Sequence, residues 1–203
     1  MKQFGVQFLS IAACLAVLGN CVMPVSAGQQ LGQTDFEDGV GLPWHVCESA
    51  PGEMEFEIRD GKYEITIVNP GGASNGGEDR WDCQFRHRGL KLVSGCTYEV
   101  AYEITASNNC TYYTKIGDMA EPFTEDWHGN PDDGQYDSYW NVQNLTANQT
   151  VSFHGTFTAN RTAEVEWAFH IGGDTVPAGT VFTFDNMSCL LYTSDAADDL
   201  IGV

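Results

Sequence analysis

The sequence predicts an all-β protein built as a sandwich of two antiparallel sheets. Three observations support this fold class. Between Gly28 and Ser188, short runs of alternating polar and apolar residues recur, many of them rich in β-branched and aromatic residues. Clusters of Gly, Asn, Asp and Pro separate these runs, as is typical of turns. No segment has the apolar period of an amphipathic helix, so helices that connect parallel strands are not expected.

The expected strands follow one another along the chain with short polar connections. The first two form a hairpin that turns at Asp60-Gly61, because Asp-Gly favours the tight turn of a two-residue hairpin. The next segment, WDCQFRHRG, alternates apolar with polar side chains, and the later ones alternate aromatic or β-branched residues with Thr and Glu. The expected strand segments are residues 56–68, 81–89, 97–106, 110–118, 150–159, 164–173 and 181–188.

Successive side chains of a strand point to opposite faces of its sheet, so the alternation predicts which residues are buried. In WDCQFRHRG, Cys83 and Phe85 are expected in the core, together with His87, while Gln84 and Arg86 stand on the outer face. The same alternation in EVEWAFHIGG sends Trp167, Phe169 and Ile171 inward and Glu166 and His170 outward. Trp44 lies in a similar apolar context and is also expected in the core.

The two ends of the chain are expected to lie outside the domain. Residues 1–27 combine Lys2, an apolar run and a small-residue site at Val25-Ser26-Ala27, which together predict a secretory signal peptide and a secreted, extracellular protein. Residues 189–203, CLLYTSDAADDLIGV, begin with a stretch that resembles the translation of an adapter used in sequencing libraries. We therefore expect residues 28–188 to be the domain and residues 189–203 to be a non-native tail, with whatever followed the domain missing.

The net charge of the 203-residue chain is −19, from 28 acidic and 9 basic side chains. Nucleic acids and anionic membranes bind through clusters of Lys and Arg, so neither is an expected partner. Four cysteines of the expected domain, Cys47, Cys83, Cys96 and Cys110, allow two disulfides in any of three pairings, and the sequence does not choose among them. Their spacing does not match a structural zinc site.

Several motifs together resemble the carbohydrate-binding modules of families 4 and 9. They are FEDGVGLPWHVCES, WDCQFRHRGLKLVSGCTYEV, KIGDMAEPFTEDW, FHIGGD and FDNMS, in that order along residues 35–188. The resemblance is closest to the N-terminal module of secreted family 9 cellulases of anaerobic bacteria. It implies a monomeric jelly-roll sandwich with a concave cleft. Such a module binds single β-glucan chains, of cellulose or of mixed-linkage glucan, without catalysis. It would target a glycoside hydrolase domain, now missing, to plant polysaccharide.

The resemblance also implies which residues contact sugar and which hold a metal. Tryptophans wall the cleft in relatives, and the matching positions are Trp81 and Trp127, with Trp140 as a third candidate; the alternative for each is packing in the core or a loop. The matching polar residues are Gln84, Arg86 and His170, for which a surface ion pair is the alternative. A structural calcium would match Asp35, Glu37 and Asp185, since hard cations prefer oxygen ligands.

Two other functions remain open. Glu53, Glu55 and Glu57 alternate on one strand, and a jelly-roll endo-β-glucanase with Glu53 and Glu57 as its carboxyl pair is the catalytic alternative. Against it, the family match places this segment on an outer strand, where an acidic solvent face is expected. The third possibility is a surface adhesion domain that binds no sugar, in which the indoles would be buried.

Overall fold

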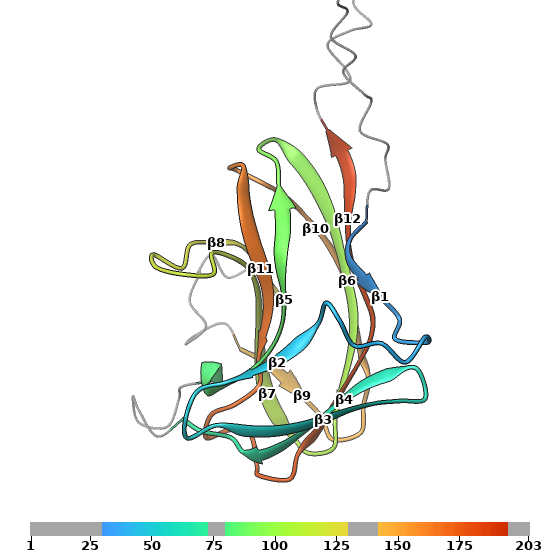
Figure 1. Cartoon of the computed structure of the whole chain (residues 1–203), viewed down its shortest axis with the longest axis vertical. Helices are drawn as coiled ribbons and strands as arrows, with labels where there is room; N and C mark the ends of the chain where they lie inside the picture. The colour runs from blue at the N-terminus through green and yellow to red at the C-terminus, as the bar shows by residue number, and fades with distance from the viewer. Residues whose placement is uncertain (1–29, 73–79, 130–141, 195–203) are drawn as a thin grey trace, which may run out of the picture.

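The computed structural model describes residues 30–72, 80–129 and 142–194, and it confirms the predicted fold class. Two antiparallel sheets of six strands face each other, with β5 and β11 in one layer and β6 and β12 in the other (Figure 1). The described residues contain strands and one 3-10 turn, η1 (Arg80–Asp82), and no helix among them is long and apolar enough to cross a bilayer.

The first layer, sheet A, has the strand order β10, β6, β12, β4, β3, and β1 pairs with the far end of β12. The strands are β10 (Val151–Thr158), β6 (Cys96–Ala106), β12 (Val181–Ser194), β4 (Lys62–Asn69), β3 (Glu53–Arg59) and β1 (Gln30–Thr34).

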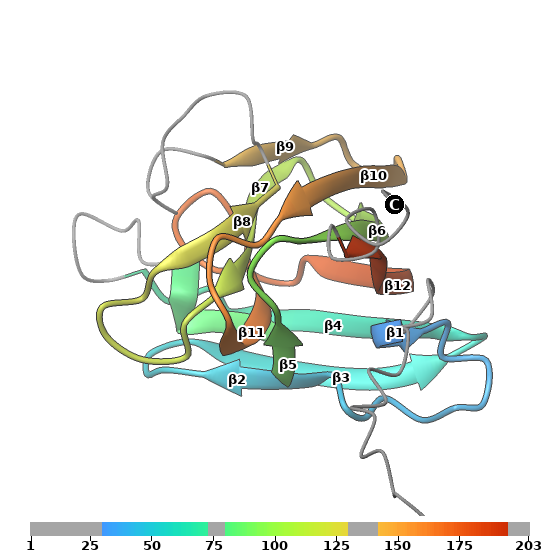
Figure 2. The same ribbon diagram turned by 90° about the horizontal axis from the view of Figure 1, so that it is seen from above.

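The second layer, sheet B, has the order β2, β5, β11, β7, β8, and β9 pairs with β7. Its strands are β2 (His45–Glu48), β5 (Cys83–Leu92), β11 (Ala163–His170), β7 (Cys110–Gly117), β8 (Glu125–His128) and β9 (Gln143–Leu145). Seen from above, β9 and β10 lie at one side of the molecule, and β2 and β3 lie at the opposite side (Figure 2).

The predicted hairpin is present between β3 and β4. Its two turn residues, Asp60 and Gly61, have φ angles of 51° and 72°, as the tight turn of a two-residue hairpin requires. A Cβ on Gly61 would also come within 2.4 Å of a carboxylate oxygen of Glu37. The hairpin turn is therefore specified both by backbone conformation and by a close neighbour.

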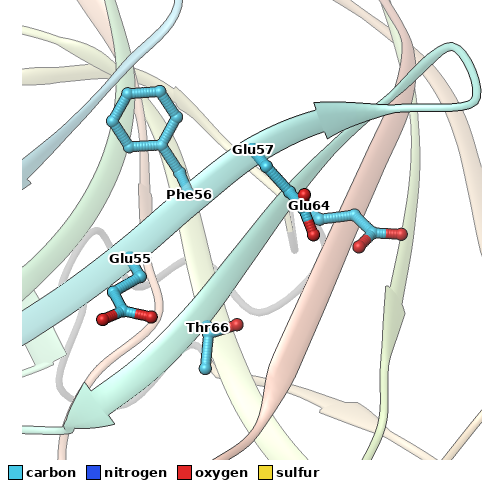
Figure 3. Close-up of a pocket in the computed structure, with 5 residues that line it drawn as sticks. All are labelled: Glu55, Phe56, Glu57, Glu64 and Thr66. Carbon is cyan, nitrogen blue, oxygen red and sulfur yellow. The ribbon is translucent and has the colours of Figure 1, made fainter.

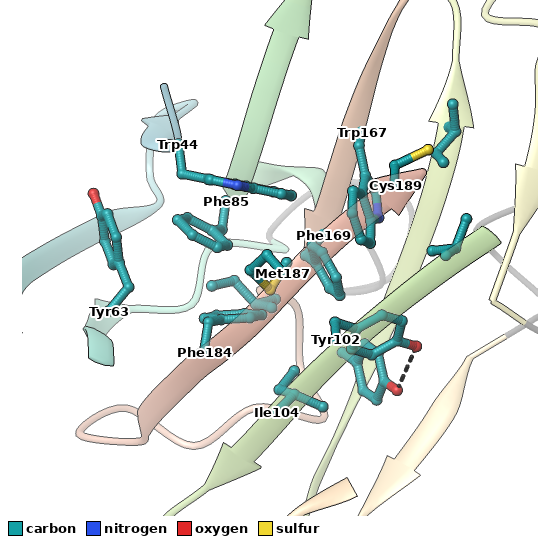
Figure 4. Packing of buried hydrophobic residues seen from close by; sticks show 14 of the residues in the cluster. Trp44, Tyr63, Phe85, Tyr102, Ile104, Trp167, Phe169, Phe184, Met187 and Cys189 are labelled. Carbon is teal, nitrogen blue, oxygen red and sulfur yellow. Dashed lines mark hydrogen bonds between the residues drawn. The ribbon is translucent and has the colours of Figure 1, made fainter. Parts of the chain in front are cut away.

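Aromatic rings from both sheets fill the space between the layers (Figure 4). The Phe85 ring lies at the centre, with its centroid 4.7 Å from the Trp44 ring and 4.4 Å from the Phe184 ring. Trp167 and Phe169 of β11 continue this layer, and both are fully buried. The predicted core positions of Cys83, Phe85, His87, Trp44, Trp167, Phe169 and Ile171 are all confirmed.

Two bulges change the phase of the alternation within single strands. In β5 the core residues are Cys83, Phe85 and His87 and then Leu90 and Leu92, because Gly89 (φ 80°) adds one residue opposite β11. In β12 the phase changes near Asn186 (φ 50°), where the pairing with β6 skips. An extra residue in one strand shifts all later side chains to the other face, so each bulge keeps apolar residues inward on both sides of it.

Strand β12 continues past Ser188, the expected end of the domain, to Ser194. Cys189 pairs with Val100 of β6 and is fully buried, and Leu191 is also in the core. The non-native origin of residues 189–203 stays a prediction, but the first of them complete the last strand of sheet A. The five described cysteines, Cys47, Cys83, Cys96, Cys110 and Cys189, are all free thiols, so none of the possible disulfides among Cys47, Cys83, Cys96 and Cys110 is formed.

Trp127 does not take the position that the sequence predicted for it. Its side chain is only 3% exposed, and its ring centroid lies 5.5 Å from that of Phe153 and 6.4 Å from that of Trp167. The reason is the pairing of β8 with β7, which places Trp127 opposite Ile116 on the core face and leaves His128 on the outer face. The prediction that Trp127 stacks on sugar was wrong, and its alternative, core packing, is correct.

We expect the substitution Trp127→Ala to lower the free energy of unfolding by about 3–5 kcal/mol, because it leaves a large cavity between the sheets. The half-buried indole of Trp81 provides the matched control, and Trp81→Ala is expected to cost less than about 1 kcal/mol. Urea unfolding followed by circular dichroism measures both. Equal losses for the two variants would contradict the different placement of the two indoles.

Candidate functional site

The outer face of sheet B carries a row of basic and small side chains that crosses all five strands of its main path. Cross-strand pairing joins His45 to Arg86, Arg86 to Ala168, Ala168 to Lys115, and Lys115 to His128. Phe85, Phe169 and Ile116, which flank these residues along their strands, all face the core. We call His45, Arg86, Ala168, Lys115 and His128 the basic row.

A second row lies next to the basic row on the same face. It consists of Cys47, Gln84, His170 and Tyr113, which are paired in that order across β2, β5, β11 and β7. The Tyr113 and His170 rings lie side by side, with centroids 5.7 Å apart.

Trp81 lies in η1, immediately before β5 and three residues before Gln84 of the second row. Its indole is half-buried, and its backbone carbonyl accepts a hydrogen bond of 2.8 Å from the Gln84 amide. The structure therefore brings together four of the predicted sugar-binding residues, Trp81, Gln84, Arg86 and His170, on or beside one sheet face. Trp140 lies outside the described residues.

Arg86 and Glu166 show that the ion-pair alternative is also realised, although loosely. A guanidinium nitrogen of Arg86 is 3.9 Å from a carboxylate oxygen of Glu166, while Arg88 donates to the same oxygen at 3.0 Å. The Arg86 Nε lies 3.4 Å from the His45 Nε2. Because Glu166 binds Arg88 more closely, Arg86 keeps donors for a further acceptor.

His170 is held in its neutral form by its surroundings. Burial, together with the nearby positive charges of Lys115, Arg80 and Arg86, lowers its pKa to about 3. Its Nδ1 is buried and has no hydrogen-bond partner within the described ranges. A neutral imidazole donates from one nitrogen and accepts at the other, whereas a protonated imidazole can only donate. The neutral ring of His170 therefore suits a sugar hydroxyl group better than a protonated ring would.

Sequence reasoning missed Tyr113 and Lys115, although the signal was present in the segment CTYYTKIG. Tyr112 and Ile116 face the core, and the alternation then places Tyr113 and Lys115 on the outer face. Phe123, in the loop before β8, was also missed. Its ring is 51% exposed and lies over the Lys115 ammonium, 5.6 Å from nitrogen to centroid.

The three predicted calcium ligands do not form a cation site in the described structure. Asp185 makes an ion pair of 3.0 Å with Lys62, and Asp35 accepts a hydrogen bond from the backbone amide of Glu37. Within residues 30–72, 80–129 and 142–194, no group of three or more His, Cys, Asp or Glu side chains is placed to hold a metal ion. A lysine at one of the expected ligands opposes cation binding, so these side chains do not fit the calcium that the resemblance implies.

A pocket of about 280 Å³ lies on the outer face of sheet A, at the edge formed by β3 and β4 (Figure 3). It is lined by Glu55, Phe56, Glu57, Glu64 and Thr66, so it is the place where the glucanase alternative would operate. However, the Arg59 guanidinium contacts the carboxylates of both Glu57 and Glu64. Glu53 stands opposite Asn69 at the start of the strand. The arrangement matches the acidic solvent face that was the expected alternative.

We expect His170 to make folding stability depend on acidity. In the unfolded chain its pKa returns to about 6.5, so below that pH the unfolded state binds a proton that the folded state does not take up until about pH 3. Stability is therefore lost as the pH falls through this window. Urea unfolding between about pH 7 and about pH 4 should show a smaller loss for His170→Gln than for the unchanged protein. His154→Gln, which removes an exposed imidazole on sheet A, controls for the loss of a histidine, and a wild-type pH dependence in His170→Gln would contradict the assignment.

Comparison with known proteins agrees with this architecture. The model of a family of carbohydrate-binding domains, CBM_4_9, matches residues 28–179. A cellulose 1,4-β-cellobiosidase from Acetivibrio thermocellus is 32% identical over 169 residues, which cover 79% of this chain but 17% of that enzyme. The chain thus spans about a sixth of the length of this relative.

Solved structures share the fold. A CBM4 structure superimposes with a TM-score of 0.57 at 24% identity, covering 72% of this chain and 85% of that one. The N-terminal cellulose-binding domain of β-1,4-glucanase C from Cellulomonas fimi superimposes with a TM-score of 0.53 at 17% identity, covering 82% and 95%. With three quarters of its length matched by the family model and a two-sheet sandwich as its fold, the chain belongs to the CBM_4_9 family of carbohydrate-binding domains.

Proposed function

We propose that the outer face of sheet B binds single β-glucan chains, of cellulose or of mixed-linkage glucan, without catalysing any reaction. The observation that carries this proposal is the meeting of Trp81, Gln84, Arg86 and His170 at one end of that face. A flat indole packs against the apolar face of a pyranose ring, and amide, guanidinium and imidazole groups bind its hydroxyls. A matched relative is a cellobiosidase and a matched structure is a cellulose-binding domain, which supports a cellulose-type ligand.

The wider role that we propose is to hold a glycoside hydrolase at its polysaccharide. The cellobiosidase relative is far longer than the matched module, so there such a module is one part of a larger enzyme. The signal-like residues 1–27 support secretion, which polysaccharide degradation outside the cell requires. We propose that the module acts as a monomer, since Trp81, Gln84, Arg86 and His170 all lie on or beside one sheet face of a single chain.

Electrophoresis through a gel that contains soluble barley β-glucan or hydroxyethylcellulose tests the binding surface. The unchanged protein should be retarded, and Trp81→Ala should remove most of the retardation because it removes the stacking surface. Its melting temperature should change little, since the indole is half-buried.

Phe56→Ala is the matched control for this experiment. Phe56 is an aromatic residue with a 57% exposed side chain beside the acidic pocket of sheet A, so its loss should leave the retardation intact. If Phe56→Ala abolishes retardation and Trp81→Ala does not, the ligand lies on sheet A and the proposal fails. If neither polysaccharide retards the unchanged protein, β-glucan is not the ligand.

Chelation tests the calcium prediction separately. Since Lys62 already neutralises Asp185 and no acidic cluster surrounds it in the described structure, we expect EDTA to leave the melting temperature unchanged. A decrease that added calcium reverses would show that backbone carbonyls, or residues beyond the described ranges, complete a site. The same measurement on Lys62→Met tests the role of the ion pair, because this variant leaves the Asp185 carboxylate without its partner and available to a cation.

A further inference from the structure

The basic row concentrates positive charge on the one face that we propose for ligand binding. The chain has only nine Lys and Arg residues against 28 Asp and Glu residues, yet Arg86 and Lys115 lie in the same row. They are two strands apart, about 10 Å between backbones. Ala168 places only a methyl group between them. The positive charge of Arg80 also acts on this region, since it lowers the pKa of His170.

Lys115 is the most unusual member of the row. It is only 5% exposed, yet it makes no ion pair with any carboxylate of the described residues. Its ammonium is placed over the ring of Phe123, a contact that offsets only part of the cost of removing a charge from water. A buried cation without a counter-ion gains more from an incoming anion than an exposed one does.

Among the described residues, the neighbouring carboxylates of Glu166 and Glu125 are bound to groups other than Lys115. Glu166 is held by Arg88 at 3.0 Å and reaches Arg86 only at 3.9 Å. Glu125, at the far end of β8, accepts a hydrogen bond from the Tyr113 hydroxyl. The Nδ1 of His170, which is itself 94% buried, has no partner within the described ranges and adds a further polar atom at the same place.

We infer that this face prefers β-linked glycans whose sugars carry carboxylates, such as uronic acid units, over the equivalent neutral chains. The inference rests on the proposed function, and it names a class of ligand for the same surface. Arg86 and Lys115 flank Ala168 on the neighbouring strands, so a sugar carboxylate that reaches this part of the face can contact both side chains. Charge-assisted hydrogen bonds from a guanidinium and an ammonium are stronger than those to a hydroxyl. The sugar ring itself still packs on Trp81.

The net charge of −19 does not contradict an anionic ligand. Salt screens the charge of the whole protein beyond about 10 Å. This charge therefore mainly slows the approach of an anion. At contact distance, the ligand meets Arg86 and Lys115, which lie in a setting with little water. Local charge therefore decides the affinity, while the overall charge affects the rate of association.

Calorimetric titration of the full chain tests the inference with two matched probes. One is cellotetraose, and the other is the β-1,4-linked tetramer of glucuronic acid, which differs only by oxidation at C6. We expect the acidic tetramer to bind about tenfold more tightly at low salt. This advantage should shrink when sodium chloride is raised from about 0.05 M to about 0.5 M.

Variants then assign the preference to the basic row. Lys115→Gln should bring the ratio of the two affinities close to one, while Lys115→Arg, which keeps the charge, should retain a preference. Arg59→Gln removes one positive charge from the exposed hairpin of sheet A and should leave the ratio unchanged. If Lys115→Gln does not fold, the salt dependence and the ratio in the unchanged protein still decide.

The possible failures are distinct. If cellotetraose binds as tightly as the acidic tetramer or more tightly, the charge preference is overturned and the proposed β-glucan function stands. If only the acidic tetramer binds, the charge preference stands and the neutral β-glucan of the proposed function is wrong. If neither tetramer binds and neither soluble glucan retards the protein, both fail. An equal loss of the preference in Arg59→Gln and Lys115→Gln would show that overall charge, and not the basic row, is responsible.

Discussion

The packing of Phe85 and Phe169 between the two sheets is the constraint on which the rest of the site depends. These residues are cross-strand partners on β5 and β11, and both are fully buried among the rings of Trp44, Trp167 and Phe184. Because side chains alternate along a strand, burial of Phe85 and Phe169 puts their neighbours Gln84, Arg86, Ala168 and His170 on the opposite face. The apolar core thus specifies the register, and the register assembles the polar surface. A shift of one residue in this pairing would expose the rings and bury the charges. Core packing therefore stabilises the arrangement of the polar surface as well as the fold.

The alternation explains how much of the structure the sequence predicted. Strands rich in aromatic and β-branched residues gave the two-sheet fold, and the same periodicity placed Gln84, Arg86 and His170 outward. It would have found Tyr113 and Lys115 if it had been applied to β7. It failed for Trp127 because β8 has only four residues, EDWH, so that its facing depends on the pairing with β7 and not on a pattern. The ion pair between Lys62 and Asp185 joins residues that are 123 positions apart. Local sequence therefore does not show that a lysine lies beside one of the expected calcium ligands.

The bulges at Gly89 and Asn186 show that local backbone conformation also determines which side chains of a strand face outward. If Gly89 paired regularly instead of forming a bulge, one continuous alternation would place Leu90 and Leu92 on the same face as Arg86 and Arg88. The bulge instead shifts the alternation by one residue and returns the apolar residues to the core. The outward polar side chains of β5 are therefore Gln84, Arg86 and Arg88 before the bulge and Lys91 after it. This change of phase is a property of the backbone, because Gly89 takes a positive φ at the bulge.

Charge is distributed unequally between the two outer faces, and this distribution separates their roles. On sheet A, the carboxylates of Glu57 and Glu64 are exposed or half-buried and share the guanidinium of Arg59, so water and a counter-ion stabilise them without a ligand. On sheet B, Lys115 and His170 are almost fully buried, and the groups around them leave an ammonium and an imidazole nitrogen unpaired in the described structure. A polar group that is both desolvated and unpaired costs free energy in the unbound protein, and a ligand that pairs with it recovers that cost. An acidic, well-solvated face offers a ligand no comparable gain. This difference between the two faces supports the proposal that the ligand binds on sheet B.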